Sequence, residues 1–285
     1  MIPRIKVYQS FYEDWQVGHL DTDFVPYDCR VHPYPQLYET YWMLRLYESG
    51  SPKNCDYSGL FSWRFFSKGK IPGSKFIEFV KKNPGFDVYF INPFPLLAYL
   101  FFNIWDEGEQ CHPGLVNLSQ SLMERAKYPI SIADMGRNDH NTLLYCNYWV
   151  GNINFWDTYM AFIQPLFSCC TNWNEGDGPN PYFGLTVYEG RRIPFFPFIF
   201  ERLFSTLLFI NNNITVCPFS RTFEEMLAVC DNSFMWKFMN QFGPEIDEID
   251  RRFRFHPSCV KEHRALFQAS VEAGQRLSRV NNQQE

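Results

Sequence analysis

Two short apolar runs, each closed by polar residues or proline, constrain the fold of this chain most. They are YSGLFSWRFFSK at Tyr57–Lys68 and FDVYFINPFP at Phe86–Pro95. A short apolar run between such breakers is typical of a buried strand that ends at a loop. The buried strands of an α/β sheet carry their site residues at the carboxyl edge of the sheet. The first polar groups to consider are therefore Arg64, Asp87 and Asn92.

Strand-like and helix-like segments alternate along the chain. The patterns predict strands at 4–11, 57–61, 86–91 and 142–150, and helices at 36–47, 74–82, 114–127, 154–165 and 198–210. A capping box, Thr222 at the N-cap with Glu225 three residues later, opens a further helix. This order predicts an α/β fold with a mixed, mostly parallel sheet and helices on both faces. We expect one domain over 1–245 and a helical C-terminal extension over 246–285 whose last residues fray.

Composition excludes several classes of function. The chain has 285 residues and a net charge of −5 without a basic block, which argues against general nucleic-acid binding. The longest apolar stretch, Val88–Trp105, is interrupted by Asn and Pro, so we expect no transmembrane segment. The nine cysteines have no metal-site spacing and, with no secretory signal visible, predict reduced thiols in a cytoplasmic protein. The 30 phenylalanines predict either an aromatic core or a groove that stacks sugars or bases.

Familiar catalytic motifs are absent from the sequence. It contains no GxGxxG after the first strand, no GxxxxGK[ST], no HExxH and no GxSxG. Dinucleotide-binding, P-loop, zincin and α/β-hydrolase functions are therefore disfavoured. A methyltransferase or other nucleotide enzyme stays an alternative, although its Gly-rich turn is replaced by Tyr8-Gln9-Ser10-Phe11.

Four blocks in order resemble a known family. YETYWMLRLYES followed by YSGLFSWRF resembles the glutamate-bearing helix and the next strand of GT-A-type glycosyltransferases from capsule and surface-polysaccharide loci. FDVYFINPFP is similar to their strand that ends in Asp-x-Asp, YCNYWVGNINFWDTYM to their acceptor-side strand and helix, and FPFIFERLFSTLL to a late helix. Glycan-building enzymes of large algal viruses, one of them a xylosyltransferase, show the same order.

The resemblance implies a GT-A-like fold and the transfer of a monosaccharide from a nucleotide diphosphate sugar to a glycan or glycoprotein acceptor. A UDP-sugar is favoured, UDP-xylose among the candidates, with inversion by direct displacement, in the cytoplasm (the host cytoplasm for a viral protein). The implied donor-binding residues are Tyr8, Gln9, Ser10, Phe11, Arg64, Asn92 and Arg202, and the acceptor-binding residues are Trp149, Asn152 and Trp156.

The chain departs from the family where the Asp-x-Asp would stand, since it has Asn92-Pro93-Phe94 there. A carboxylate pair bridges Mn²⁺ or Mg²⁺ to the diphosphate, and one amide oxygen is a poor replacement. A metal would be held by Asp87 with Asn92, or by the acidic run 106–109. Without a metal, the leaving diphosphate would be neutralised by Arg64, Arg202 or Lys68. The same departure favours a rival function, a catalytically inactive carbohydrate-binding or virion-associated protein on this fold.

An inverting transfer needs a carboxylate that takes the proton of the acceptor hydroxyl. The candidates are Asp106, Glu107, Glu109, Asp134, Asp139 and Glu201. Glu201 and Arg202 stand out because they interrupt an apolar run, where an unpaired charge is costly. They are predicted either to form an internal ion pair or to meet a sugar hydroxyl and a phosphate.

Overall fold

One sheet organises the protein. The computed structural model describes residues 2–174, 176, 178–229, 233–253 and 257–281. Within these residues, six strands pair in the order β2-β1-β3-β5-β4-β8. All neighbours are parallel except β5, which runs antiparallel to both β3 and β4. The strands are β1 (Ile5–Phe11), β2 (Val25–Asp28), β3 (Tyr57–Ser62), β4 (Val88–Phe90), β5 (Trp149–Gly151) and β8 (Val216–Pro218). The predicted α/β fold with a mixed, mostly parallel sheet is confirmed.

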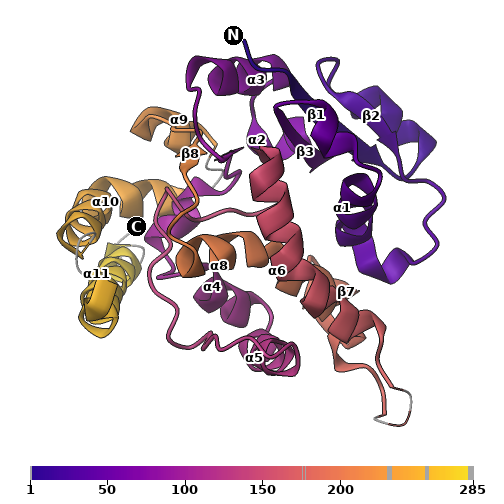
Figure 1. Ribbon diagram of the computed structural model, residues 1–285. Helices are drawn as coiled ribbons and strands as arrows, with labels where there is room; N and C mark the ends of the chain where they lie inside the picture. Colours follow the sequence, from indigo (N-terminus) through magenta and orange to yellow (C-terminus); the bar gives the residue numbers. More distant parts are fainter. Residues whose placement is uncertain (1, 175, 177, 230–232, 254–256, 282–285) are drawn as a thin grey trace.

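Helices cover both faces of this sheet (Figure 1). One face packs Phe61 and Val150 against the α2–α3 segment, with Phe65 and Phe76 at the contact. The other face packs Trp149 and its neighbours against α1, α6 and α8. The helices named so far are α1 (Tyr38–Glu48), α2 (Phe65–Gly69), α3 (Gly73–Lys82), α6 (Ile153–Thr171) and α8 (Leu203–Ile210).

The centre of the sheet requires a glycine. A Cβ atom on Gly59 of β3 would lie 1.9 Å from the carbonyl oxygen of Trp149 in β5. Only a residue without a side chain permits the backbones of β3 and β5 to approach this closely.

The C-terminal helices α10 and α11 lie side by side against the body of the protein (Figure 1). They enclose a separate apolar cluster with η4, in which Leu96 and Tyr99 meet Phe238 and Phe267. The expected boundary at residue 245 lies inside α10.

The remaining elements have the following bounds: η1 (Asp14–His19), η2 (Pro35–Leu37), η3 (Ser51–Asn54), η4 (Pro95–Tyr99), α4 (Ile104–Cys111), α5 (Leu115–Arg125), η6 (Pro181–Phe183), β6 (Leu185–Tyr188), β7 (Arg191–Pro194), α7 (Phe195–Glu201), α9 (Phe223–Ala228), α10 (Ser233–Phe253), η7 (Pro257–Cys259) and α11 (Val260–Asn281).

Three predicted elements differ in the structure. Of the strand predicted at 142–150, only the end is β5, because Cys146 and Asn147 have φ of 66° and 53°, which no strand tolerates. The helix predicted at 198–210 is divided into α7 and α8 at Arg202, and α6 continues beyond the predicted end at residue 165 to Thr171. The capping box of Thr222 is present with both its bonds.

Two further findings concern the whole chain. Within the described ranges, no helix combines the length and the apolar character needed to cross a membrane. The eight described cysteines have free thiols, and Cys230 lies outside the described residues.

Candidate functional site

A cavity of about 140 Å³ opens at the carboxyl end of β3; we refer to it as the Glu39 cavity. Three elements deliver its charged groups: the first turn of α1 carries Glu39, α2 carries Lys68, and the end of α7 carries Glu201. Ser62, the last residue of β3, and Cys146 also line the cavity. The cavity therefore lies at the edge where an α/β sheet is expected to place its site.

Glu39 is the carboxylate with the unusual environment. It is partly buried, and it forms no ion pair with any described residue, whereas Glu201 accepts a hydrogen bond from the backbone N–H of Cys146 at 2.8 Å. Burial raises the pKa of Glu39, and the nearby charge of Glu201 raises it further, against the opposing effect of Lys68. Two carboxylates whose surroundings differ in this way are typical of acid–base sites.

Lys68 supplies a positive charge beside these carboxylates. Its Nζ donates to the Cys146 sulfur at 3.1 Å. Burial lowers the pKa of Lys68, but Cys146 and Glu201 raise it more, so the ammonium stays charged. Burial, followed by the charge of Glu201, raises the pKa of Cys146 to about 12. The thiol is thus neutral at pH 7, and the negative charge that Lys68 faces there is that of Glu201.

Backbone strain concentrates around the same cavity. Tyr38, Cys146 and Asn147 line it, and all three have positive φ, at 47°, 66° and 53°. Only six non-glycine residues in the described chain have positive φ. Such conformations cost roughly 1–3 kcal/mol each and persist where the surroundings impose them, which is often at functional sites.

An exposed aromatic group includes Trp63, the residue that follows Ser62 at the end of β3. The ring centroids of Trp15 in η1 and Trp63 lie 4.9 Å apart, and His19 lies 5.9 Å from Trp63. Trp15 is 54% exposed, and the exposed guanidinium of Arg64 lies 5.9 Å from the Trp63 ring. Flat rings beside a cation suit a base or a sugar with an attached phosphate.

The predicted donor residues of β1 have structural roles instead. Gln9 and Ser10 are fully buried, and both bond to the carbonyl oxygens at the end of β3. The side-chain Oε1 of Gln9 also accepts from the N–H of Asp21. Tyr8 and Phe11 are likewise buried. The sequence missed the next residue, Tyr12, whose buried hydroxyl has no described partner; burial and then the charge of Glu39 raise its pKa.

The predicted carboxylates of α4 are also occupied elsewhere. Asp106 pairs with Arg264 at 2.5 Å. Glu107 pairs with Arg202, and Glu109 accepts from the first backbone N–H groups of α5 at 2.8 Å. These three side chains stabilise helix packing, and none of them lines the Glu39 cavity.

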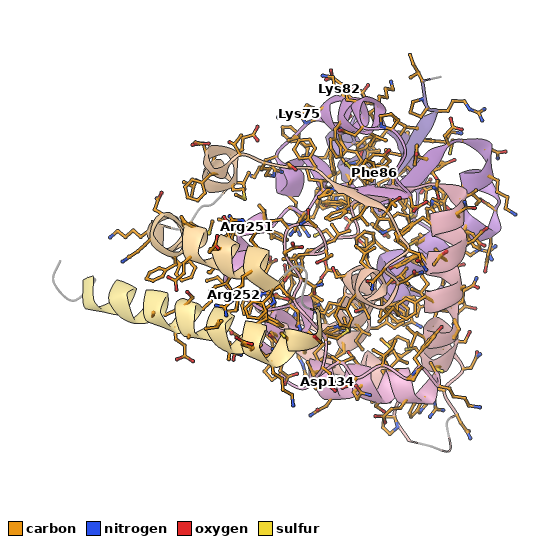
Figure 2. All side chains as sticks on the ribbon, turned by 60° about the vertical axis from the view of Figure 1, so that its left-hand side comes forward. Lys75, Lys82, Phe86, Asp134, Arg251 and Arg252 are labelled. Carbon is orange, nitrogen blue, oxygen red and sulfur yellow. The ribbon has the colours of Figure 1, made fainter. Side chains whose placement is uncertain are left out.

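Asp134 and Asp139 do not line that cavity. Asp139 accepts from the backbone and side chain of Asn141 and so closes a turn. Figure 2 shows Asp134 at the lower edge of the molecule, on the opposite side from Lys75 and Lys82. Of the six predicted carboxylates, Glu201 alone lines the Glu39 cavity.

Arg202 forms the internal ion pair that the sequence left as one alternative. It is 1% exposed, pairs with Glu107, and donates to the carbonyl oxygens of Ile104 and Phe198 at 3.0 and 2.7 Å. A Cβ on Gly108 would lie 2.4 Å from its Nε, so the surrounding helix is shaped around the guanidinium. This side chain is not free to meet a phosphate.

The predicted acceptor residues belong to the core. Trp149 and Trp156 are 1% and 0% exposed, so neither ring offers a sugar platform. Asn152 caps α6 by accepting from Phe155 N–H and donates to Asp87 at 3.0 Å. The predicted acceptor surface is therefore not brought together at these positions.

The predicted metal pair is not brought together either. Asp87 precedes β4 and accepts from Thr215, whereas Asn92 follows the same strand. Five steps of extended chain separate them by about 16 Å, too far for one ion. Among the described residues, no group of three or more acidic, histidine or cysteine side chains could hold a metal.

No family model and no curated protein matches the chain. Among solved structures, the apo structure of WbbM, a bifunctional glycosyltransferase, is similar with a TM-score of 0.48 and 15% sequence identity. The similarity covers 75% of this chain and 44% of that protein, so this chain spans less than half of its length. A likeness of this size does not establish a common activity.

Proposed function

We propose that the protein is a glycosyltransferase that moves a monosaccharide from a nucleotide diphosphate sugar, with UDP-sugars favoured and UDP-xylose among them, to a glycan acceptor. The observation that carries the proposal is the Glu39 cavity, where two carboxylates and one lysine meet at the carboxyl edge of the sheet. The family resemblance of the blocks that contain Glu39, Ser62 and Glu201 supports the same function.

Glu39 is the proposed general base of an inverting transfer. It lacks an ion-pair partner among the described residues, and its raised pKa brings it closer to neutral pH, where a base is most effective. Glu201 is a positioning residue, since it holds the Cys146 backbone and faces Lys68. Lys68, with Arg64, whose charge acts on Lys68, would neutralise the diphosphate as it leaves.

The side chains at this site do not fit a divalent metal ion. Mn²⁺ and Mg²⁺ require several oxygen ligands, and the two carboxylates here share their space with a charged lysine. The proposed transfer therefore relies on cationic side chains.

The acceptor would lie in a wider cavity of about 390 Å³ beside η2. Aromatic rings and amides line it, which is a combination suited to sugar faces and hydroxyls. These residues are Tyr34, Gln36, Tyr41, Phe167, Asn172 and Phe183. Leu37 and Tyr38 are consecutive residues that line this cavity and the Glu39 cavity respectively, so an acceptor here would extend toward Glu39.

A thermal-shift screen of UDP-sugars, each with and without Mn²⁺, tests the binding step. A ligand that binds the native state raises the melting temperature by mass action. We expect stabilisation by at least one UDP-sugar that does not require the metal, together with slow release of UDP. Stabilisation by free sugars alone, without UDP release, would instead favour the inactive carbohydrate-binding protein.

A further inference from the structure

A second cavity, of about 160 Å³, lies at the carboxyl ends of β4 and β8, and we refer to it as the Arg221 cavity. The strand ends contribute Asn92 and Phe219, the 139–141 turn contributes His140, and the segment before α9 contributes Arg221. This cavity shares no lining residue with the Glu39 cavity.

Three nitrogen atoms of the lining are buried without a hydrogen-bond partner among the described residues. They are Asn92 Nδ2, His140 Nε2 and Arg221 Nε. An unsatisfied buried donor costs about 1–3 kcal/mol. Three such nitrogens around one cavity are therefore unusual, and together they suit a ligand that presents several acceptor oxygens.

The charge balance in the cavity is positive. Arg221 donates through Nη2 to the carbonyl oxygen of Gly69 and forms no ion pair with a described residue. The nearest carboxylate on its own segment, Glu225, accepts from Thr222 N–H and pairs with Lys75 at 3.4 Å. Arg221 is partly buried, and its Nε is buried without a partner among the described residues; leaving such a charge without a counter-ion is costly, so an anion is expected to accompany it.

The carboxylates near His140 already have partners, since Asp247 accepts from the Tyr99 hydroxyl and Asp250 pairs with Arg137. Asp139 is adjacent in sequence, but both of its oxygens accept from Asn141. The Oδ1 atom of Asn92 accepts from the N–H of Phe94 at 3.0 Å, which directs the amide so that Nδ2 is the free end. Burial lowers the pKa of His140, so its ring is neutral at pH 7.

We propose that the Arg221 cavity binds an oxyanion, a phosphate or carboxylate group, through Arg221, Asn92 and His140. The arrangement offers one charged donor, one amide donor and, in the tautomer protonated at Nε2, one imidazole donor, a set that matches a tetrahedral or planar oxyanion. The anion has two possible sources, the diphosphate of a nucleotide or an acidic sugar of the acceptor. The two cavities are linked through α2, because Lys68 lines the Glu39 cavity and Gly69 holds Arg221.

Isothermal titration of the full-length protein with inorganic pyrophosphate tests the site. We expect the wild type to bind with a dissociation constant on the order of 1 mM or tighter at low salt. The decisive variant is Asn92→Asp, which keeps the oxygen that accepts from Phe94 and replaces the free donor with a negative charge. It should weaken binding about tenfold or more, as should Arg221→Met. The control, Arg191→Met, removes an exposed arginine of β7 and should bind as the wild type does.

Competition against bound pyrophosphate identifies the source of the anion. Displacement by UDP but not by methyl glucuronoside would assign the cavity to the donor diphosphate. Displacement by methyl glucuronoside but not by UDP would assign it to an acidic acceptor. Absence of pyrophosphate binding by the wild type would overturn the proposal, as would wild-type affinity in a folded Asn92→Asp protein. The result does not depend on glycosyl transfer, so it can fail while the proposed function stands.

Discussion

Glu39 lies in the first turn of α1, where the partial positive charge of a helix N-terminus ordinarily favours an ionised carboxylate. Burial and the charge of Glu201 nevertheless raise its pKa. The fold thus favours the protonated form of Glu39, and ionisation of this carboxyl group does not stabilise the folded protein. Sites of this kind are typical of residues that are retained for activity at a cost in stability.

This environment predicts a pH-dependent effect of Glu39→Gln. Because the folded-state pKa is raised, the folded protein holds the proton more tightly, and wild-type stability falls as pH rises through that pKa. The variant cannot ionise, so its melting temperature should exceed that of the wild type at pH 8, and the difference should shrink at pH 4. Glu48→Gln, on the exposed side of the same helix, is the matched control. An identical difference at both pH values would show that Glu39 is not desolvated.

Among the elements, β3 and β5 fix the position of the site. The close approach at Gly59 brings the strained Cys146–Asn147 segment, just before β5, to the end of β3. Ser62 at that end donates to or accepts from the hydroxyl of Tyr148 at 2.9 Å, which ties the two strands together at the cavity.

Gly59→Ala should therefore separate these strands. The added Cβ would meet a backbone carbonyl that cannot rotate away, so we expect a loss of about 1–3 kcal/mol or more in the free energy of unfolding. Gly18→Ala, where no atom lies within 4 Å of the new Cβ, should be close to neutral. Urea denaturation of both variants measures the difference, and equal stabilities would contradict the role given to Gly59.

The elements also show how far the sequence could predict this fold. β3 and β4 were predictable because their apolar runs are bounded by clear breakers. β2 and the β6–β7 hairpin could not be predicted, because each strand has only four residues, too few for an alternation of apolar and polar residues to be recognised. The strand predicted before β5 was wrong because two consecutive positive φ values do not follow from residue type.

At the scale of the whole molecule, Asp250 fastens the C-terminal helices to the body. Arg137 donates to both of its oxygens at 2.9 Å, and His263 of α11 lies 2.8 Å from one of them. Burial would raise the pKa of Asp250, but the hydrogen bonds from His263 and Arg137 lower it overall.

Asp250→Asn should weaken this attachment. A depressed folded-state pKa contributes stability that is present above the ordinary aspartate pKa and is lost as pH falls through the folded value. The variant should lose up to about 3–5 kcal/mol at pH 7 and show a smaller acid dependence below about pH 4. The control is Glu248→Gln, which removes one partner of the exposed Glu248–Arg251 ion pair on the same helix. Unfolding monitored from pH 3 to 7 gives the comparison, and parallel curves for wild type and Asp250→Asn would contradict the account.

The candidate site is visible only at this largest scale. Glu39, Lys68, Cys146 and Glu201 come from four separate segments. The sequence named Lys68 as a candidate and placed Glu39 in a block that resembles a family helix, but no pattern indicated that these side chains meet in one cavity. Glu201 was a sequence candidate because a charge in an apolar run requires an explanation. The same reasoning selected Arg202, which proved to be the partner of Glu107. Sequence alone could show that the pair was unusual but not which member faced the cavity.

The rate of UDP release from a UDP-sugar by Glu39→Gln, relative to wild type and Glu48→Gln, tests the central claim most directly. Loss of a positioned general base predicts a rate about 10²–10⁴-fold below wild type, while Glu48→Gln stays at the wild-type rate. UDP should still raise the melting temperature of the Glu39 variant, because the base does not hold the nucleotide. A folded Glu39→Gln protein that retains more than about a tenth of the wild-type rate would have lost less activity than the removal of a general base causes. In that case Glu39 is not the base and the proposed site is wrong.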